Sequence, residues 1–180
     1  MSELEIRPAT PADIPEILAF IRELADYEHE PASAIATHED ILRDGFGPDQ
    51  RFRCLIAEWS GNPVGFALFF YNYSTWKGRA GIYLEDLFVR PAFRGKGIGK
   101  ALISSVAATA VAEKCSRLEW AVLDWNQPAI DFYNSLGATP MSEWTIMRVS
   151  GDALPVLATS CEPSWRSPQA KQTAEKPLLG

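Results

Sequence analysis

The sequence has little cysteine and histidine. Its three cysteines (Cys54, Cys115 and Cys161) lie far apart among 180 residues and form no CxxC pair, and the chain has only two histidines. An odd number of widely spaced cysteines argues against a disulfide framework, and no Cys or His stands at metal-ligand spacing. We therefore expect a reducing, cytoplasmic location and no metal site.

Long apolar runs and an excess of positive charge are also missing. No apolar run approaches the roughly 18 residues that a membrane-spanning helix needs. The first five residues lack the basic flank and apolar core of a secretory signal. Because the net charge is −6, non-specific binding to nucleic acid is disfavoured. We expect neither a membrane nor a nucleic-acid partner.

The negative charge is unevenly distributed along the chain. Residues 1–50 carry twelve acids and three bases, whereas residues 51–180 carry eleven acids and fourteen bases. Residues 90–100 contain four bases and no acid. A local basic segment in an acidic chain suits a small phosphorylated ligand, although the acidic part is equally consistent with a solvated helical surface.

Hydrophobic periodicity predicts one domain at residues 1–158, with helices flanking a sheet. The alternation of apolar residues predicts strands at 4–8, 52–59, 64–73, 81–89, 117–123 and 144–149. Caps and three- to four-residue spacing predict helices at 10–25, 37–47, 98–114, 126–137 and 152–158. This order indicates an α/β or α+β fold with a mixed sheet, and residues 159–180 are expected to form a flexible tail.

A glycine-rich segment, Arg94-Gly95-Lys96-Gly97-Ile98-Gly99, lies between a predicted strand and a predicted helix. Glycines let backbone N–H groups approach a ligand, and the N-terminus of a helix adds positive potential. Arg94 and Lys96 supply further positive charge. The segment therefore predicts a phosphate-binding site.

Two common phosphate motifs do not fit this segment. The P-loop pattern GxxxxGK[ST] fails on spacing and on the missing hydroxyl, and in the dinucleotide pattern GxGxxG the third glycine would come one residue later. A structural turn without a ligand is the remaining alternative. Preceded by Leu87-Phe88-Val89-Arg90-Pro91, the pattern R-G-x-G-I-G resembles the acetyl-CoA signature of the GNAT superfamily.

The resemblance extends over residues 4–158 to the spermidine/spermine (diamine) acetyltransferases. The matching segments are Ile6–Thr10, Glu23–Glu28, Asp44–Gly47, Tyr83–Asp86 and Trp125–Tyr133. It implies a GNAT fold with a mixed central sheet of six to seven strands, acetyl-CoA as cosubstrate, no metal, and a homodimer. It also implies two cofactor-contacting stretches beside the glycine-rich segment. These are Leu87, Phe88 and Val89, and then Asn126, Gln127, Pro128 and Ala129.

The chemistry of amine acetylation requires a proton acceptor and a proton donor. An alkyl ammonium with a pKa of ~10.4 is about three units from deprotonation at neutral pH, a cost of about 4 kcal/mol. A carboxylate can take that proton, and an acid can protonate the departing CoA thiolate. The resemblance assigns the carboxylate to Glu85 and the acid to Tyr133. Periodicity alone favours the alternative that Tyr133 is a core aromatic of its helix.

A polyamine acceptor implies an acidic channel, since each ammonium group favours a carboxylate partner. The resemblance assigns acceptor binding to Tyr27, Glu28, Glu85, Asp86 and Glu143. Glu85 and Asp86 interrupt an apolar strand, and adjacent strand residues face opposite sides unless a bulge intervenes. The chain departs from the family pattern at His29-Glu30-Pro31 and in the shortened segment 141–144. Both departures bear on the length and identity of the acceptor and not on the acetyl transfer itself.

These features together predict direct transfer of acetyl from acetyl-CoA to a primary amine of a diamine or polyamine in a ternary complex. The alternative acceptors are a lysine-like amino acid such as thialysine, or another small amine. A non-catalytic CoA-binding sensor is a further alternative, which the presence of Glu85 and Tyr133 disfavours.

Overall fold

The structure, a computed structural model, describes residues 3–159. The chain forms two compact units, of which the first ends at Gln127 and the second begins at Pro128. Of the tail predicted at 159–180, residues 160–180 lie outside the described residues, and so does Cys161.

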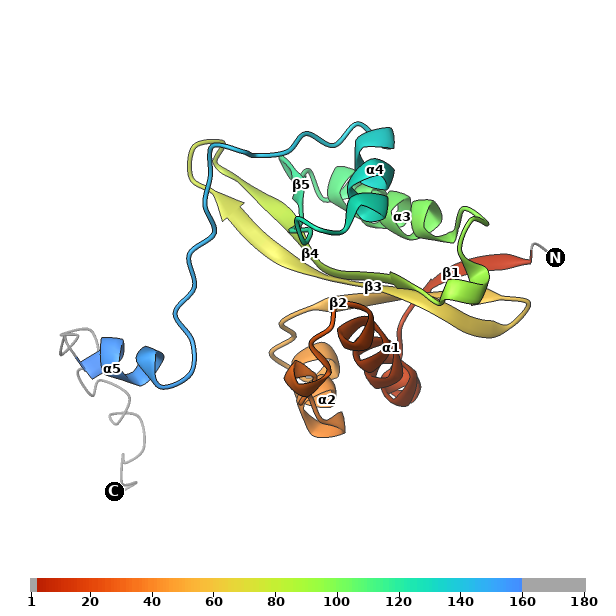
Figure 1. Cartoon of the computed structure of the whole chain (residues 1–180), viewed down its shortest axis with the longest axis horizontal. Coiled ribbons are helices and arrows are strands. Elements are labelled where there is room, and N and C mark those ends of the chain that lie inside the picture. The colour runs from red at the N-terminus through yellow and green to blue at the C-terminus, as the bar shows by residue number, and fades with distance from the viewer. Residues whose placement is uncertain (1–2, 160–180) are drawn as a thin grey trace, which may run out of the picture. The chain divides into compact units, whose positions relative to one another are not determined.

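A mixed sheet of five strands forms the centre of the first unit (Figure 1). In spatial order the strands are β1 (Leu4–Pro8), β2 (Arg53–Trp59), β3 (Asn62–Ser74), β4 (Arg79–Val89) and β5 (Leu118–Glu119). Neighbours from β1 to β4 are antiparallel, whereas β4 and β5 are parallel. The predicted α/β class with a mixed sheet is confirmed, but the expected six to seven strands are five in the described residues.

Helices cover both faces of this sheet (Figure 1). Helices α1 (Ile14–Tyr27) and α2 (His38–Phe46) lie on one face, and α3 (Ile98–Ala112) lies on the other. Helix α1 is amphipathic, and its side chains Ile14, Ile17 and Phe20 are completely buried. Phe20 stacks on Phe66 of β3 with ring centroids 5.4 Å apart. The core under α1 therefore fixes the position of this helix against β3.

The start of α1 is held by an ionic contact between neighbouring elements. A short 3-10 helix, η1 (Pro11–Asp13), precedes α1. Asp13 accepts hydrogen bonds of 2.7 and 2.8 Å from Arg7 of β1 and one of 2.7 Å from the backbone N–H of Thr10. The Arg7 guanidinium beside it holds the pKa of the Asp13 carboxyl well below its usual range. This contact joins β1 to α1.

Two predicted strands differ from the structure. The strand predicted at 117–123 is reduced to β5, which pairs with β4 only at Ile82 and Tyr83. The strand predicted at 144–149 is absent, because no described strand pairs with these residues. A strand needs a neighbour that supplies backbone hydrogen-bond partners, and β propensity alone supplies none.

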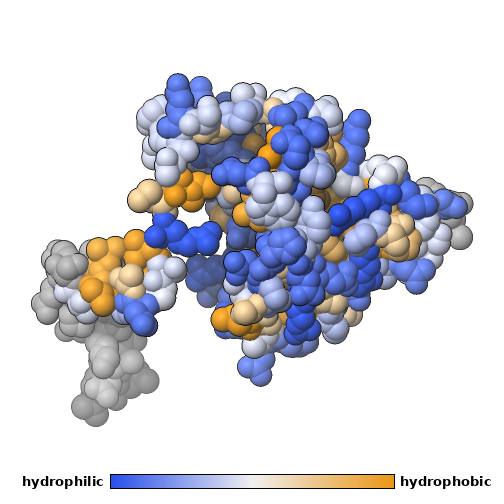
Figure 2. Space-filling view, in the orientation of Figure 1, coloured by the Kyte–Doolittle hydropathy of each residue, from blue (hydrophilic) through white to orange (hydrophobic). Residues whose placement is uncertain are grey.

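The second unit contains the rest of α4 (Gln127–Ser135) and the short helix α5 (Ala153–Thr159). Gly137, with φ 86, follows α4, and its N–H donates to the carbonyl of Asn134 at 3.0 Å. The helix therefore ends just before Gly137, the last residue of the range predicted for it. Apolar side chains are exposed over α5 (Figure 2), namely Leu154, Val156 and Leu157.

Candidate active site

The glycine-rich segment forms the turn before α3. A 3-10 helix, η3 (Pro91–Phe93), leads into it, and Gly97 is the N-cap of α3. Gly95 and Gly97 have φ of 76 and 79, which strongly favours glycine. A Cβ at either position would meet no atom within 4 Å, and no side chain caps the helix. The turn therefore has open space beside both glycines and leads into an uncapped helix start, as an anion-binding turn requires.

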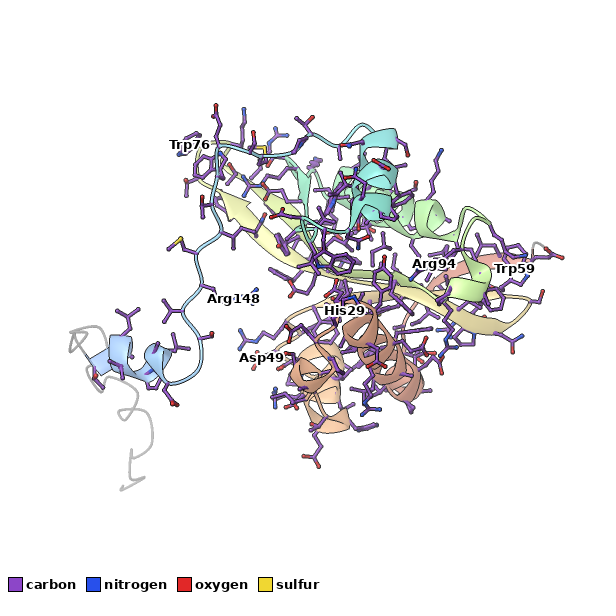
Figure 3. All side chains as sticks on the ribbon, in the orientation of Figure 1. His29, Asp49, Trp59, Trp76, Arg94 and Arg148 are labelled. Atoms are coloured by element: carbon purple, nitrogen blue, oxygen red, sulfur yellow. The ribbon has the colours of Figure 1, made fainter. Side chains whose placement is uncertain are left out.

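The basic side chains around this turn have different surroundings. Arg90 donates to Glu23 of α1 at 2.7 and 3.1 Å, so its charge is already paired. Lys96 lies with its Nζ 4.7 Å from the ring centroid of Trp59 (Figure 3 labels Trp59). Lys96 and Lys100 are both exposed. These two lysines are therefore accessible to a phosphate bound at the turn.

The end of β4 presents backbone groups beside this turn. Leu87, Phe88 and Val89 pair with β3 on one side. On the other side β5 reaches only as far as Tyr83, so among residues 3–159 no strand covers this stretch of β4. The predicted cofactor-contacting strand residues and the predicted phosphate loop are thus continuous in the structure.

A β-bulge in β4 arranges the two adjacent acids. Leu68 of β3 pairs with Asp86 but Phe69 pairs with Leu84, so Glu85 is an extra residue without a partner across the ladder. Asp86 consequently shares a face with Leu68, the face that α1 covers. Glu85 follows Leu84, and alternation puts it on this same face. A bulge therefore does intervene between the two acids, and because it shifts the alternation they do not face opposite sides.

The carboxylates near this bulge influence one another. Burial, followed by the negative charges of Glu85 and Glu28, raises the pKa of Asp86 to about 7. Burial also raises the pKa of Glu28, which follows the last residue of α1. Glu85 is exposed. Three acids from two separate elements thus form one negative cluster, in which a bound cation would relieve the mutual repulsion.

Tyr27, the last residue of α1, connects several predicted site residues. Its hydroxyl donates to Oδ1 of Asn126 at 3.1 Å, and Asn126 is only 7 % exposed. Its ring lies 6.0 Å from that of Trp125, which in turn lies 5.5 Å from His29. The structure therefore brings together Tyr27 and Asn126, which lie 99 residues apart in the sequence.

The remaining predicted site residues belong to the second unit. Pro128, Ala129 and Tyr133 lie on α4, and the Tyr133 ring is 5.3 Å from that of Phe132. Glu143 is exposed, in the turn where the N–H of Trp144 donates to the carbonyl of Met141. The roles of Tyr133 and Glu143 remain predictions.

Two features of the site were not found from the sequence. The first is the contact between Arg94 and Tyr27, in which the guanidinium carbon lies 4.7 Å from the ring centroid, and the sequence contains no signal for it. The second is the bulge, and for this a signal exists. Ile82 and Leu84 are aliphatic residues at even-numbered positions, whereas Leu87 and Val89 are aliphatic residues at odd-numbered positions. The two-residue alternation is therefore shifted by one residue between Leu84 and Leu87. Such a shift within one strand indicates an inserted residue.

Other chemistry-bearing groups lie outside this site. A pocket of about 320 Å³ is lined by residues from or next to β1, β2, β3, α2 and α3, among them Phe52 and Cys54, and contains none of the predicted site residues. Burial raises the pKa of the Cys54 thiol far above its usual value, which makes it a poor nucleophile. Within residues 3–159 no group of three metal-ligating side chains occurs. None of the described helices has the length and apolar character needed to cross a membrane.

Comparison with known proteins agrees with this geometry. The Acetyltransferase (GNAT) family matches residues 16–138. The thialysine N-epsilon-acetyltransferase of Bos taurus is 43% identical over 88% of this chain and 99% of its own length. The spermidine/spermine N(1)-acetyltransferase-like protein 1 of Homo sapiens is 37% identical over 86% of this chain and 24% of its own length.

A solved structure shares the fold of this chain. An integron cassette protein from the mobile metagenome of V. cholerae superposes with a TM-score of 0.75 and 28% identity, covering 88% of this chain and 99% of that one. The family match covers more than half of the chain and includes the glycine-rich turn, the bulge and α4. The chain therefore belongs to the GNAT family of acetyltransferases, and it is an N-acetyltransferase.

Proposed function

We propose that this enzyme transfers the acetyl group of acetyl-CoA to a terminal primary amine of a small diamine or polyamine. The observation that carries the proposal is the negative cluster of Glu28, Glu85 and Asp86, in the same compact unit as the anion-binding turn before α3. A basic turn suits the anionic donor, and an acidic cluster suits a cationic acceptor.

The donor half fits a CoA pyrophosphate. The open space beside Gly95 and Gly97 and the uncapped start of α3 leave room and N–H donors for phosphate oxygens. Lys96 and Lys100 add charge, and the uncovered side of Leu87–Val89 offers backbone groups to the rest of the cofactor. Acetyl-CoA would supply an activated thioester. The second predicted cofactor stretch is Asn126, Gln127, Pro128 and Ala129.

The acceptor half fits an alkyl ammonium. The amine must lose a proton before it can attack, and a carboxylate with a pKa near the working pH is well matched to take it. With a pKa of about 7, Asp86 meets this condition better than an ordinary carboxylate. We therefore assign the proton to the Glu85–Asp86 pair, with Asp86 as the principal acceptor and Glu28 and Tyr27 binding the ammonium.

Transfer would be direct, in a ternary complex, with Tyr133 protonating the departing thiolate. Cys54 is buried, and burial raises the pKa of Cys115 as well. Neither thiol therefore offers the thiolate that an acyl-cysteine route needs. Glu143 would bind a distal ammonium group of a long acceptor.

A lysine-like amino acid is the second candidate acceptor. The thialysine N-epsilon-acetyltransferase of Bos taurus, at 43% identity, supports it. So does the L-ornithine N5-acetyltransferase NATA1 of Arabidopsis thaliana, at 42% identity over 66% of this chain. Both candidates have a terminal primary amine on a short alkyl chain. They differ in the α-carboxylate, which the acidic cluster would repel.

An acceptor screen tests the proposal. Initial rates of thiol release from acetyl-CoA would be compared for putrescine, spermidine, thialysine and lysine, each against a reaction without amine. We expect the highest kcat/KM with a diamine or polyamine. Turnover of thialysine or lysine alone would select the second candidate, and no turnover of any amine would leave a CoA-binding sensor.

We further propose a cytoplasmic homodimer without a nucleic-acid partner. The resemblance to the diamine acetyltransferases supports the dimer, and so do the exposed apolar side chains Trp144, Ile146 and Met147 of the second unit. Sedimentation equilibrium would give a mass near twice the 19.9 kDa of one chain. A mass of one chain at micromolar concentration would contradict the dimer.

A further inference from the structure

The Arg94 side chain is engaged with protein groups on the α1 side of the glycine-rich turn. Its Nε donates to the carbonyl of Val89, the last residue of β4, at 2.9 Å. Its guanidinium carbon lies 4.7 Å from the ring centroid of Tyr27 and 5.8 Å from that of Phe88 (Figure 3 labels Arg94). The side chain thus ties the first residue of the turn to the end of β4 and the end of α1.

Tyr27 carries this connection toward the acceptor side. Its hydroxyl is fixed by Asn126 at 3.1 Å, and the next residue in the chain is Glu28. Glu28 in turn acts electrostatically on Asp86. Two consecutive residues at the end of α1 therefore face both sites: Tyr27 contacts Arg94 of the turn, and the charge of Glu28 acts on Asp86.

The turn itself needs such an anchor. Gly95 and Gly97 lack side chains and both adopt positive φ, so the backbone between them has few contacts that would hold one conformation. A turn that is ordered before the ligand arrives binds it more tightly, because less conformational entropy is lost on binding. Arg94 is the residue of the turn whose side chain is anchored to both β4 and α1.

We propose that Arg94 is a positioning residue that, through Tyr27, orders the donor turn and couples acetyl-CoA binding to amine binding. This rests on the proposed function. Arg94 then acts by holding the turn and not by contacting phosphate with its guanidinium. Binding of an ammonium at Glu28 and Asp86 steadies the end of α1, which steadies Arg94 and the turn, and by linkage CoA binding favours the amine equally.

A double-mutant cycle on CoA affinity tests the link without any acceptor. CoA binding would be measured by calorimetry for wild type, Arg94→Ala, Tyr27→Leu and the double variant. We expect each single change to weaken binding about tenfold and the double change to weaken it no further, because the two residues act as one unit. Multiplicative losses in the double variant would overturn the link.

Conservative variants separate positioning from charge. Arg94→Lys keeps the positive charge but loses the Nε donor and the planar guanidinium, so we expect it to bind CoA nearly as weakly as Arg94→Ala. Tyr27→Phe keeps the ring under Arg94 but loses the hydrogen bond to Asn126, so we expect it to bind CoA more tightly than Tyr27→Leu does. Wild-type affinity in Arg94→Lys would instead show a simple charge effect. These milder variants also decide the question if Tyr27→Leu does not fold, as judged from its thermal midpoint.

Another arginine–tyrosine pair provides a matched control. The Arg53 guanidinium lies 5.3 Å from the Tyr71 ring, and neither residue belongs to the predicted site. Arg53→Ala should leave CoA affinity unchanged. If it weakens CoA binding as much as Arg94→Ala does, the loss is not specific to the turn and the proposal fails.

The coupling is measured by adding an amine. Putrescine, or thialysine if the screen selects it, should raise CoA affinity about fivefold or more in wild type and have no effect in Arg94→Ala. An equal effect in both proteins would overturn the coupling. If no amine is turned over, the proposed function fails, whereas the CoA cycle still decides the link between Arg94 and Tyr27.

Discussion

The donor turn and the acceptor cluster of this N-acetyltransferase are built in different ways. The donor turn is mainly backbone, with two glycines at positive φ and the uncapped start of α3. The acceptor cluster consists of side chains, with Asp86 and Glu85 from the bulged β4 and Glu28 from the end of α1. A backbone site depends on a short continuous segment, whereas a side-chain cluster depends on how distant elements pack. The two halves should therefore respond differently to substitution.

The largest expected effect is on the donor turn. Gly97→Asp puts a side chain and a negative charge into the space left for phosphate, at a position with φ 79. Acetyl-CoA binding should weaken about 10²-fold or more, since a like charge and a strained backbone act together. Calorimetry would measure this loss.

Gly78 provides the control for backbone strain. It has φ 61, also with no atom within 4 Å of a Cβ, and lies in the hairpin between β3 and β4. Gly78→Asp should therefore retain the affinity for acetyl-CoA. Unchanged affinity in Gly97→Asp would show that the phosphate does not bind at this turn.

Tyr133→Phe tests whether the catalytic residues extend beyond the first unit. Loss of a general acid should lower kcat about 10²-fold while the KM for acetyl-CoA changes little. Steady-state rates at saturating amine would measure it, with Tyr73→Phe, an exposed tyrosine of β3, as the matched control. Rates like those of wild type would remove Tyr133 from the mechanism.

The acceptor cluster should give the reaction a pH dependence near neutrality. Asp86 must be ionised to accept a proton, so kcat/KM for the amine should rise with pH through about 7. Asp86→Asn should remove this rise of kcat/KM with pH. It should lower kcat/KM at pH 8 about 30-fold and not abolish it, because Glu85 remains as a weaker proton acceptor. Rate profiles from pH 5.5 to 9 would show the change.

Glu85→Gln is the matched variant for this prediction. This variant keeps Asp86, so the rise of kcat/KM with pH should persist. The rise should occur at lower pH than in wild type, because the charge of Glu85 no longer raises the pKa of Asp86. If the rise of kcat/KM with pH survives in Asp86→Asn and disappears in Glu85→Gln, Glu85 and not Asp86 is the principal proton acceptor.

The smallest expected effect is at the rim of the acceptor cluster. Glu28→Gln removes one partly exposed charge, whose attraction for an ammonium is worth at most about 1 kcal/mol. The KM for the amine should rise up to about fivefold with kcat preserved. The change should shrink at high salt, because the Debye length falls. An equal loss of kcat would mean that Glu28 takes part in the chemical step.

Much of the fold was predictable because its signals are local. The cap at Thr37, the apolar spacing of α1 and the glycine at Gly137 each determine a helix or its end within a few residues. The strand at 144–149 was not predictable in the same way, because a strand depends on a partner. The shortening of β5 has the same origin, since β5 pairs with only two residues of β4.

The sequence by itself determined the donor turn. The glycines, the following helix and the nearby lysines are contiguous, and a contiguous segment contains all the information its backbone geometry needs. Only the tertiary structure decided the rest. It showed that the bulge turns Asp86 toward α1, that burial and the charges of Glu85 and Glu28 raise its pKa, and that the Arg94 guanidinium lies over the Tyr27 ring. These facts depend on the packing of α1 against β4, because residues 27 and 94 become neighbours only when the chain folds.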